Sequence, residues 1–317
     1  MEPNTRKMRV LLCGEKSVAE GCLQFLVNRP DTEVCGIVAA PTDWQADLIS
    51  WGAKRRIKVF VGNINDYLNE LIPMKLDFIF SVQYRPLLKR PILELPRLGC
   101  INLHFGLLPR YGGCYPIAWA ILNNESEAGA TLHYMVEKFD EGDVISQVKV
   151  PIDANTTARS LFDTLSSAAV GLFMDTYPAL CSGEIRPRAQ DLSEKLYYPE
   201  GSIDFNKDSK IQWRQNAGDI QRKICAFTFE PFQMPSSFLR LSGGNRLKVK
   251  VSQSRLGDER PGDLRKRPGE VRKVTGSGEI IIATGNNESI CVGLLDGQIA
   301  RDFFVSLGVE PEKAVFE

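Results

Sequence analysis

The chain of 317 residues contains only two histidines, His104 and His133, and its charges cancel. Lysine and arginine together number 39, as do aspartate and glutamate, so the formal net charge is zero. A protein that binds a phosphate backbone normally carries an excess of positive charge. The balance therefore disfavours nucleic acid as the main partner, and we expect no nucleic-acid partner.

Paired cysteines are also missing. The eight cysteines are scattered through the sequence, without a C-x-x-C pair and without a histidine cluster beside them. Zinc sites and disulfide frameworks both need such groupings. We expect no bound metal, and we interpret the cysteines as buried thiols of a protein in a reducing, cytoplasmic compartment.

The N-terminal segment lacks a long hydrophobic run. Before Gly14 the apolar stretch is only about five residues long, which is shorter than a signal peptide or a membrane span requires. We expect no membrane partner and interpret this stretch as the first strand.

The first half of the sequence alternates between apolar strands and amphipathic helices. The predicted strands cover residues 8–14, 32–40, 58–62, 77–83 and 99–105. Strands that are separated by helices of this length form βαβ units and a mostly parallel sheet. Residues 130–136 and 143–152 are predicted as an antiparallel pair, and residues 157–180 as a long helix. The pattern predicts an α/β fold with a Rossmann-like sheet domain.

The first strand of this sheet is not followed by the glycine pattern of a dinucleotide site. Residues 13–21 read CGEKSVAEG, which has too few glycines for G-x-G-x-x-G. A nicotinamide-dependent oxidoreductase is the generic alternative for such a topology. The missing fingerprint disfavours it.

The second half of the sequence changes character. Residues 183–205 are polar and without a clear period, and the remainder consists of short alternating strands separated by Gly-Asn and Gly-Ser turns. These strands predict a smaller C-terminal β-barrel domain of OB-like type. We assign residues 1–185 to the sheet domain, 186–205 to a linker and 206–317 to the barrel domain. The charged run 258–270 is interpreted as a solvated loop, because its acidic and basic residues nearly cancel.

Asn102 and His104 stand at the end of the strand 99–105. Residues i and i+2 of a strand share a face, so both side chains can point at one spot beyond the sheet. Asp140, in the turn after the strand 130–136, is the best-placed acid to join them. An amide donor, an imidazole and a carboxylate can together serve an acyl transfer. His133 lies inside an apolar run and is predicted to be a structural residue of a packed strand.

The sequence around these residues resembles the 10-formyltetrahydrofolate-dependent formyltransferases. The segment NLHFGLLPRYGGCYPIAWAILNNESEAGATLHYMVEKFDEGDVISQ (102–147) repeats that family's N-x-H, L-L-P-x-Y, P-I-x-W-A-I-like, T-L-H and D-x-G-D elements in order. GSIDF, ICAFTFEPF and PGEV resemble the C-terminal barrel domain of methionyl-tRNA and sugar-nucleotide formyltransferases. The resemblance covers most of the chain.

The resemblance implies a set of site residues. Asn102, His104 and Asp140 would be catalytic, with Asn102 and His104 holding the oxyanion and Asp140 assisting proton transfer. The segments implied to hold the folate comprise Pro86, Leu87, Leu88, Gly106, Leu107, Leu108, Pro109, Val136, Glu137, Lys138 and Phe139. Two residues depart from the family pattern: Gly106 replaces the usual serine, and Gly112 replaces the usual arginine.

The resemblance also implies the substrates. The formyl donor would be 10-formyltetrahydrofolate and the acceptor the primary amine of a nucleotide-linked amino sugar. The basic insertion by which methionyl-tRNA formyltransferases grip tRNA has no counterpart in residues 39–56. Methionyl-tRNA formyltransferase and 10-formyltetrahydrofolate hydrolase remain alternatives, and a homodimer is expected. Tyr84, Tyr111, Tyr115 and Tyr198 are either residues that stack on a base or cover the sugar, or ordinary half-buried structural residues.

Overall fold

The computed structural model describes residues 6–39, 46–241, 245–257, 266–294, 300–307 and 309–317. The chain divides into two units. Unit 1 comprises Met1–Pro116, Ala128–Val150 and Asp163–Tyr198, and unit 2 comprises Ile117–Glu127, Pro151–Phe162 and Pro199–Glu317. Most of the charged run 258–270 lies outside the described residues, so its interpretation as a loop stays a prediction.

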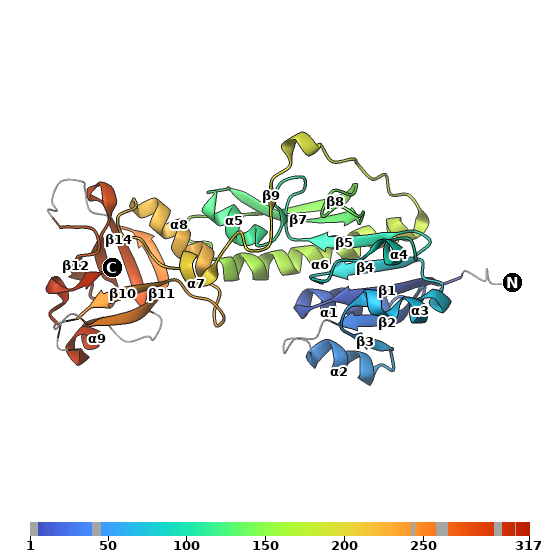
Figure 1. Cartoon of the computed structure of the whole chain (residues 1–317), viewed down its shortest axis with the longest axis horizontal. Helices are drawn as coiled ribbons and strands as arrows, with labels where there is room; N and C mark the ends of the chain where they lie inside the picture. Colours follow the sequence, from blue (N-terminus) through green and yellow to red (C-terminus); the bar gives the residue numbers. More distant parts are fainter. Residues whose placement is uncertain (1–5, 40–45, 242–244, 258–265, 295–299, 308) are drawn as a thin grey trace. The chain divides into compact units, whose positions relative to one another are not determined.

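The predicted strands of the first half form a seven-stranded sheet in unit 1, in the order β3-β2-β1-β4-β5-β7-β8 (Figure 1). Its strands are β1 (Met8–Gly14), β2 (Thr32–Ala39), β3 (Val59–Val61), β4 (Phe78–Val82), β5 (Cys100–His104), β7 (Glu127–Tyr134) and β8 (Val144–Pro151). The first five are parallel, and β7 runs antiparallel to β5. The expected Rossmann-like, mostly parallel sheet is confirmed.

Helices lie between these strands in the sequence, and one follows the last of them. They are α1 (Lys16–Val27), α2 (Ala46–Lys54), α3 (Leu68–Leu71), α4 (Arg90–Leu93), α5 (Pro116–Leu122) and α6 (Ala158–Ser182). None of the helices in the described part of the chain combines the length and the hydropathy needed to cross a lipid bilayer.

Both faces of the sheet are covered, which is why its central strands read as continuous apolar runs. Every residue of β4 is buried. On one face, Phe80 packs edge-on against Phe173 of α6, with ring centroids 4.9 Å apart. On the other face, Ile79 packs in a core with Leu88. The central strand β4 is therefore enclosed on both sides.

A second, two-stranded sheet lies in the same unit. It pairs β6 (Gly112–Gly113) in parallel with β9 (Tyr197–Tyr198), which falls in the segment expected to be a linker. Gly113 has φ +84°, and a Cβ at this position would lie 2.1 Å from the Tyr198 carbonyl oxygen. Only glycine fits here. The pairing fixes the loop that follows β5.

Unit 2 contains a six-stranded antiparallel sheet in the order β12-β13-β14-β11-β10-β15. The strands are β10 (Ser236–Arg240), β11 (Arg246–Leu256), β12 (Val271–Val274), β13 (Ile280–Ala283), β14 (Ser289–Leu294) and β15 (Val315–Phe316); the helices are α7 (Phe205–Asp208), α8 (Ala217–Phe227) and α9 (Ala300–Ser306). The sheet curls around a core that includes Trp213, Ile220 and Phe304. Its two ends meet, because Phe316 donates its N–H to the Gly269 carbonyl at 2.8 Å beside β12. The predicted barrel-like C-terminal domain is confirmed.

Candidate active site

Strand pairing places Asn102 and His133 opposite each other. In the antiparallel β5–β7 ladder Asn102 faces His133, and His104 faces Thr131. The Asn102 amide nitrogen lies 3.1 Å from His133 Nε2. His133 is buried in β7, as predicted for a packed strand, but it also shares the face on which Asn102 and His104 lie. The sequence pattern alone did not reveal this second property.

Asp140 reaches this face from the loop between β7 and β8. Its Oδ1 lies 3.5 Å from His133 Nε2, and its Oδ2 lies 3.9 Å from His104 Nδ1. The carboxylate thus stands between the two imidazoles. The structure brings Asn102, His104 and Asp140 together, as their positions in the sequence predicted, and it adds His133 to the group.

Hydrogen bonds from two other segments of the chain fix the loop that carries Asp140. Gly113 of β6 donates its N–H to Asp140 Oδ2 at 2.8 Å. Gln190 donates its side-chain amide to the carbonyl oxygens of Asp140 and Gly142, both at 2.7 Å. Neither Gly113 nor Gln190 carries a signal of its own in the sequence. Both contacts depend on tertiary structure, and together they fix the carboxylate.

Burial raises the pKa of Asp140, since desolvation penalises the charged form. When His104 and His133 are protonated, they and the Gly113 N–H stabilise the carboxylate more strongly, and the net pKa lies well below its ordinary value of 3.8. Asp140 is therefore ionised at neutral pH. An ionised carboxylate at this place can stabilise a proton on either neighbouring ring.

His104 is held by the loop that follows it. Its Nε2–H donates to the Tyr111 carbonyl at 2.7 Å, which leaves Nδ1 on the side of Asp140. A Cβ on Gly106 would lie 2.3 Å from that carbonyl oxygen and 2.7 Å from His104 Nε2. The absence of a side chain at position 106, where the formyltransferase pattern has serine, thus allows the loop to close on the histidine.

The loop residues 106–109 are anchored through Thr131. The Thr131 hydroxyl donates to the Gly106 carbonyl at 2.6 Å and accepts the Leu108 N–H at 3.2 Å. Gln147 donates its side-chain amide to the Leu108 carbonyl at 2.9 Å. The segment expected to form a wall near the formyl group is therefore rigid and continuous with the sheet.

The other two segments expected to hold the folate lie next to each other. Residues 86–88 connect β4 to α4, and residues 136–139 follow β7. Arg90 Nε lies 3.9 Å from Glu137 Oε1 across the two loops. Three large apolar side chains are exposed here: Leu87 (43%), Val136 (45%) and Phe139 (52%). Exposed large apolar side chains on these segments are compatible with a ligand-binding surface.

The tyrosines considered for base stacking have distinct environments. Tyr84 is buried, donates its hydroxyl to the Gly62 carbonyl and accepts the Ile64 N–H, so its role is structural. Tyr111 is buried and stacks on Tyr198, with ring centroids 6.0 Å apart.

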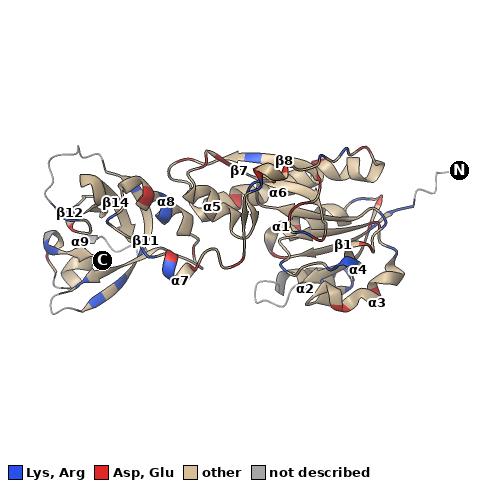
Figure 2. Ribbon diagram, turned by 45° about the horizontal axis from the view of Figure 1, so that its top comes forward, with Lys and Arg blue, Asp and Glu red and all other residues tan. Residues whose placement is uncertain are grey.

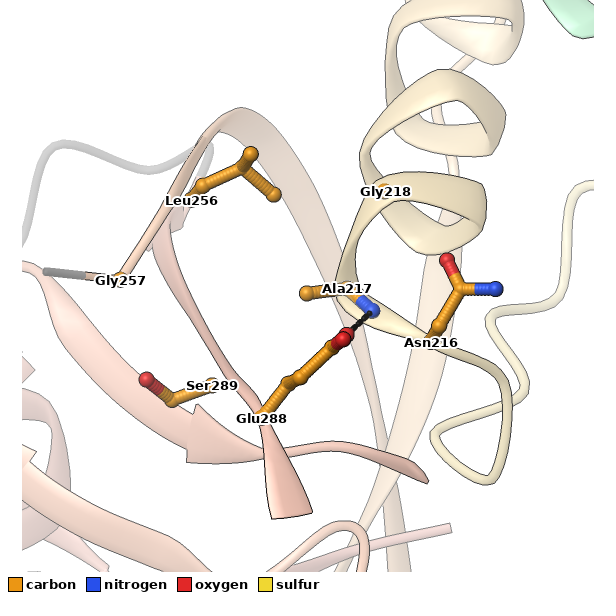
Figure 3. A pocket seen from close by; sticks show the side chains of 7 residues that line it. All are labelled: Asn216, Ala217, Gly218, Leu256, Gly257, Glu288 and Ser289. Carbon is orange, nitrogen blue, oxygen red and sulfur yellow. Dashed lines mark hydrogen bonds between the residues drawn. The ribbon is translucent and has the colours of Figure 1, made fainter. Parts of the chain in front are cut away.

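Two cavities lie in unit 2, and neither is lined by a predicted site residue. The first, of about 320 Å³, is shown in Figure 3 and is lined by Asn216, Ala217, Gly218, Leu256, Gly257, Glu288 and Ser289. Glu288 accepts the Ala217 N–H at 2.7 Å and Asn216 accepts the Asp219 N–H at 2.8 Å. These polar groups cap the first turn of α8. Among the described residues, no group of three histidine, cysteine or acidic side chains is arranged to hold a metal ion.

Comparison with known families shows where the chain belongs. The Formyl transferase model matches residues 58–176, and the Formyl transferase, C-terminal domain model matches residues 205–301. A methionyl-tRNA formyltransferase of Listeria welshimeri is 33% identical over 217 residues, which cover 68% of this chain and 68% of that protein. The chain belongs to the formyltransferase family.

Other formyltransferases and their relatives are also similar to this one. The bifunctional polymyxin resistance protein ArnA of Wigglesworthia glossinidia brevipalpis is 37% identical over 196 residues, which cover 59% of this chain but 28% of that protein. The N-formyltransferase from Helicobacter canadensis, solved in complex with folinic acid and dTDP-3-aminofucose, has a TM-score of 0.72 at 23% identity. That match covers 91% of this chain and 100% of the solved one, and it shows the shared fold.

Proposed function

We propose that this formyltransferase transfers a formyl group from 10-formyltetrahydrofolate to the primary amine of a nucleotide-linked amino sugar. The observation that carries the proposal is the position of the Asp140 carboxylate between His104 and His133, with Asn102 beside them. An amide donor, an imidazole and a carboxylate on one face of the sheet provide what acyl transfer to an amine needs.

We assign to Asn102 the stabilisation of the negative charge that develops on the formyl oxygen. A carboxamide nitrogen has two N–H bonds, and only one of them can point to His133 Nε2. Asn102 is half-buried, so its second N–H is available to the negative charge that develops on the formyl oxygen. A fixed donor in a site of this kind stabilises the transition state without reorganisation.

We assign to His104 the transfer of the proton from the amine to the folate nitrogen. The amine loses one proton as its nitrogen bonds to the formyl carbon, and the leaving nitrogen of the folate must gain one. Because the Nε2–H donates to the Tyr111 carbonyl, Nδ1 carries the lone pair that can accept and return this proton. Asp140, 3.9 Å away, stabilises the imidazolium. For His104 also to donate to the formyl oxygen, as the family resemblance implies, its Nε2–H would have to leave Tyr111.

The folate supplies the formyl group, and the expected segments suit its pterin ring. A pterin has flat apolar faces and a hydrogen-bonding edge. Leu87, Val136 and Phe139 present apolar surface to the ring faces. The backbone N–H and C=O groups of residues 86–88 and 136–139 can form hydrogen bonds with the polar edge of the pterin. Gly106 to Pro109 would form the wall near the formyl group.

The proposed acceptor is the primary amine of an amino sugar nucleotide. A structurally similar enzyme was solved with dTDP-3-aminofucose, which supports an amino sugar nucleotide. Basic and acidic residues are interspersed along the described ribbons of both units (Figure 2), and the net charge is zero. The sequence similarity to a methionyl-tRNA formyltransferase favours charged initiator tRNA as a second candidate.

Release of tetrahydrofolate, followed by absorbance, tests the proposal. The donor is mixed with enzyme and a panel of amino sugar nucleotides, with charged initiator tRNA, or with no amine. Release that requires an amino sugar nucleotide supports the proposal. Release only with the tRNA would transfer the assignment to methionyl-tRNA formylation, and release with formate in the absence of any amine would indicate a hydrolase.

A homodimer and a cytoplasmic location are further parts of the proposal. Sedimentation of the purified chain tests the first: a species of twice the monomer mass is expected. Fractionation of the cells that produce it tests the second, with the chain expected in the cytoplasmic fraction.

A further inference from the structure

We propose that His133 is a positioning residue that holds the Asn102 carboxamide in its active orientation. This inference rests on the proposed function, because it concerns the same reacting centre. His133 is buried in β7, and both of its ring nitrogens have specific neighbours.

The tautomer of His133 follows from its backbone contact. Nδ1 lies 2.8 Å from the Tyr134 carbonyl oxygen. A carbonyl oxygen only accepts, so Nδ1 must carry the proton and donate it. In the neutral ring Nε2 then has a lone pair and no hydrogen.

That lone pair determines which way Asn102 faces. Nε2 lies 3.1 Å from the Asn102 amide nitrogen and 3.5 Å from Asp140 Oδ1. The shorter contact is within normal hydrogen-bond range and the longer one is at its limit. An amide nitrogen only donates, so neutral His133 accepts one N–H of Asn102. A protonated Nε2 would instead donate to Asp140 and could no longer hold the amide nitrogen.

Orientation matters because Asn102 can present either oxygen or nitrogen to the substrate. The two ends of a carboxamide have nearly the same shape, so packing alone does not distinguish them. With its nitrogen fixed on the His133 side, Asn102 keeps its second N–H directed to the reacting centre. Without an acceptor at position 133, the amide can rotate and place a lone pair against the developing negative charge.

The inference predicts a specific pattern among variants. His133→Leu removes the acceptor, and we expect kcat to fall by up to about 10²-fold with KM values for both substrates nearly unchanged. His133→Gln keeps a side-chain oxygen that can accept the Asn102 N–H, and we expect it to recover most of the activity. Thermal unfolding of both variants identifies any loss of folding.

A double-mutant cycle separates positioning from a structural role. If His133 acts through Asn102, His133→Leu adds no further loss to Asn102→Ala. Additive losses, wild-type turnover of His133→Leu, or equal losses in His133→Leu and His133→Gln would overturn the proposal.

A measurement without turnover distinguishes failure of this inference from failure of the proposed function. Nitrogen-15 NMR of the free enzyme reports which imidazole nitrogen of each histidine is protonated. We expect His133 to carry its proton on Nδ1, and the Asn102 side-chain amide signals to shift in His133→Leu. A proton on Nε2 of His133 in the neutral ring contradicts the inference, whatever the enzyme formylates.

Discussion

Gly113 donates its backbone N–H to the Asp140 carboxylate at 2.8 Å, although the two residues are 27 positions apart in the sequence. The contact joins the short β6–β9 sheet to the loop that carries the acid. It places the acid between two imidazoles whose positions are set by the main sheet. The site is therefore assembled from two separately fixed frameworks.

Asp140→Asn is expected to lower stability in a pH-dependent manner. The pKa of Asp140 is depressed in the folded state, so its contribution is fully present above the ordinary value of 3.8 and is lost as the pH falls below that value. We expect the variant to unfold more easily by about 1–3 kcal/mol at neutral pH. Thermal unfolding of both proteins from neutral pH to about pH 3 measures the difference. A difference that stays constant over this range contradicts the assignment.

Gly106→Ala is expected to disrupt His104 without unfolding the chain. The added Cβ would lie 2.3 Å from the Tyr111 carbonyl oxygen, so the hydrogen bond from His104 to that carbonyl must lengthen or break. We expect kcat to fall by at least about tenfold, because small displacements of a reacting group are costly.

Gly112→Ala is the matched control for that substitution. Its Cβ would lie 3.3 Å from Tyr197 and 3.5 Å from the Cβ of Asp140, so only a small adjustment is needed. Activity within about threefold of wild type is expected, which corresponds to less than about 1 kcal/mol. Steady-state kinetics on both variants provide the comparison, and equal losses would show that any side chain in this loop is harmful.

The buried thiols are expected to resist modification. Burial raises the pKa of Cys100 to about 12 and raises the pKa of Cys22 further above its ordinary value. The thiolate is the reactive form, so both should react with Ellman's reagent only after unfolding. Peptide mapping after labelling in buffer and in guanidinium chloride identifies the modified residues. Rapid labelling of Cys22 in the native protein would contradict its buried position.

The placement of Asn102 and His104 together could be predicted because it depends on a local rule: alternation puts residues i and i+2 on one face of a strand. Asp140 follows β7, which runs antiparallel to β5, so the loop between β7 and β8 has to carry the carboxylate back to this face. The role of His133 was not predictable in the same way. Its apolar neighbours indicate a packed strand, and only the register of β7 against β5 places it opposite Asn102.

The segment 186–205 also contains a feature that the sequence does not predict. Its polar composition predicts a linker, and this composition does not reveal that Tyr197–Tyr198 pair with β6 beside the site. A strand of two residues is too short for any periodicity to reveal it. In the C-terminal domain the alternating strands predict the curled sheet, whereas the seven-residue helix α9 and the two-residue strand β15 were not predicted.

The most direct test of the central assignment compares wild type with Asn102→Ala and His104→Ala in the tetrahydrofolate-release assay, with folded protein verified by thermal unfolding. We expect wild type to release tetrahydrofolate only when an amino sugar nucleotide is present, and each variant to lose about 10²- to 10³-fold in rate while remaining folded. Wild-type rates in either variant would contradict the account.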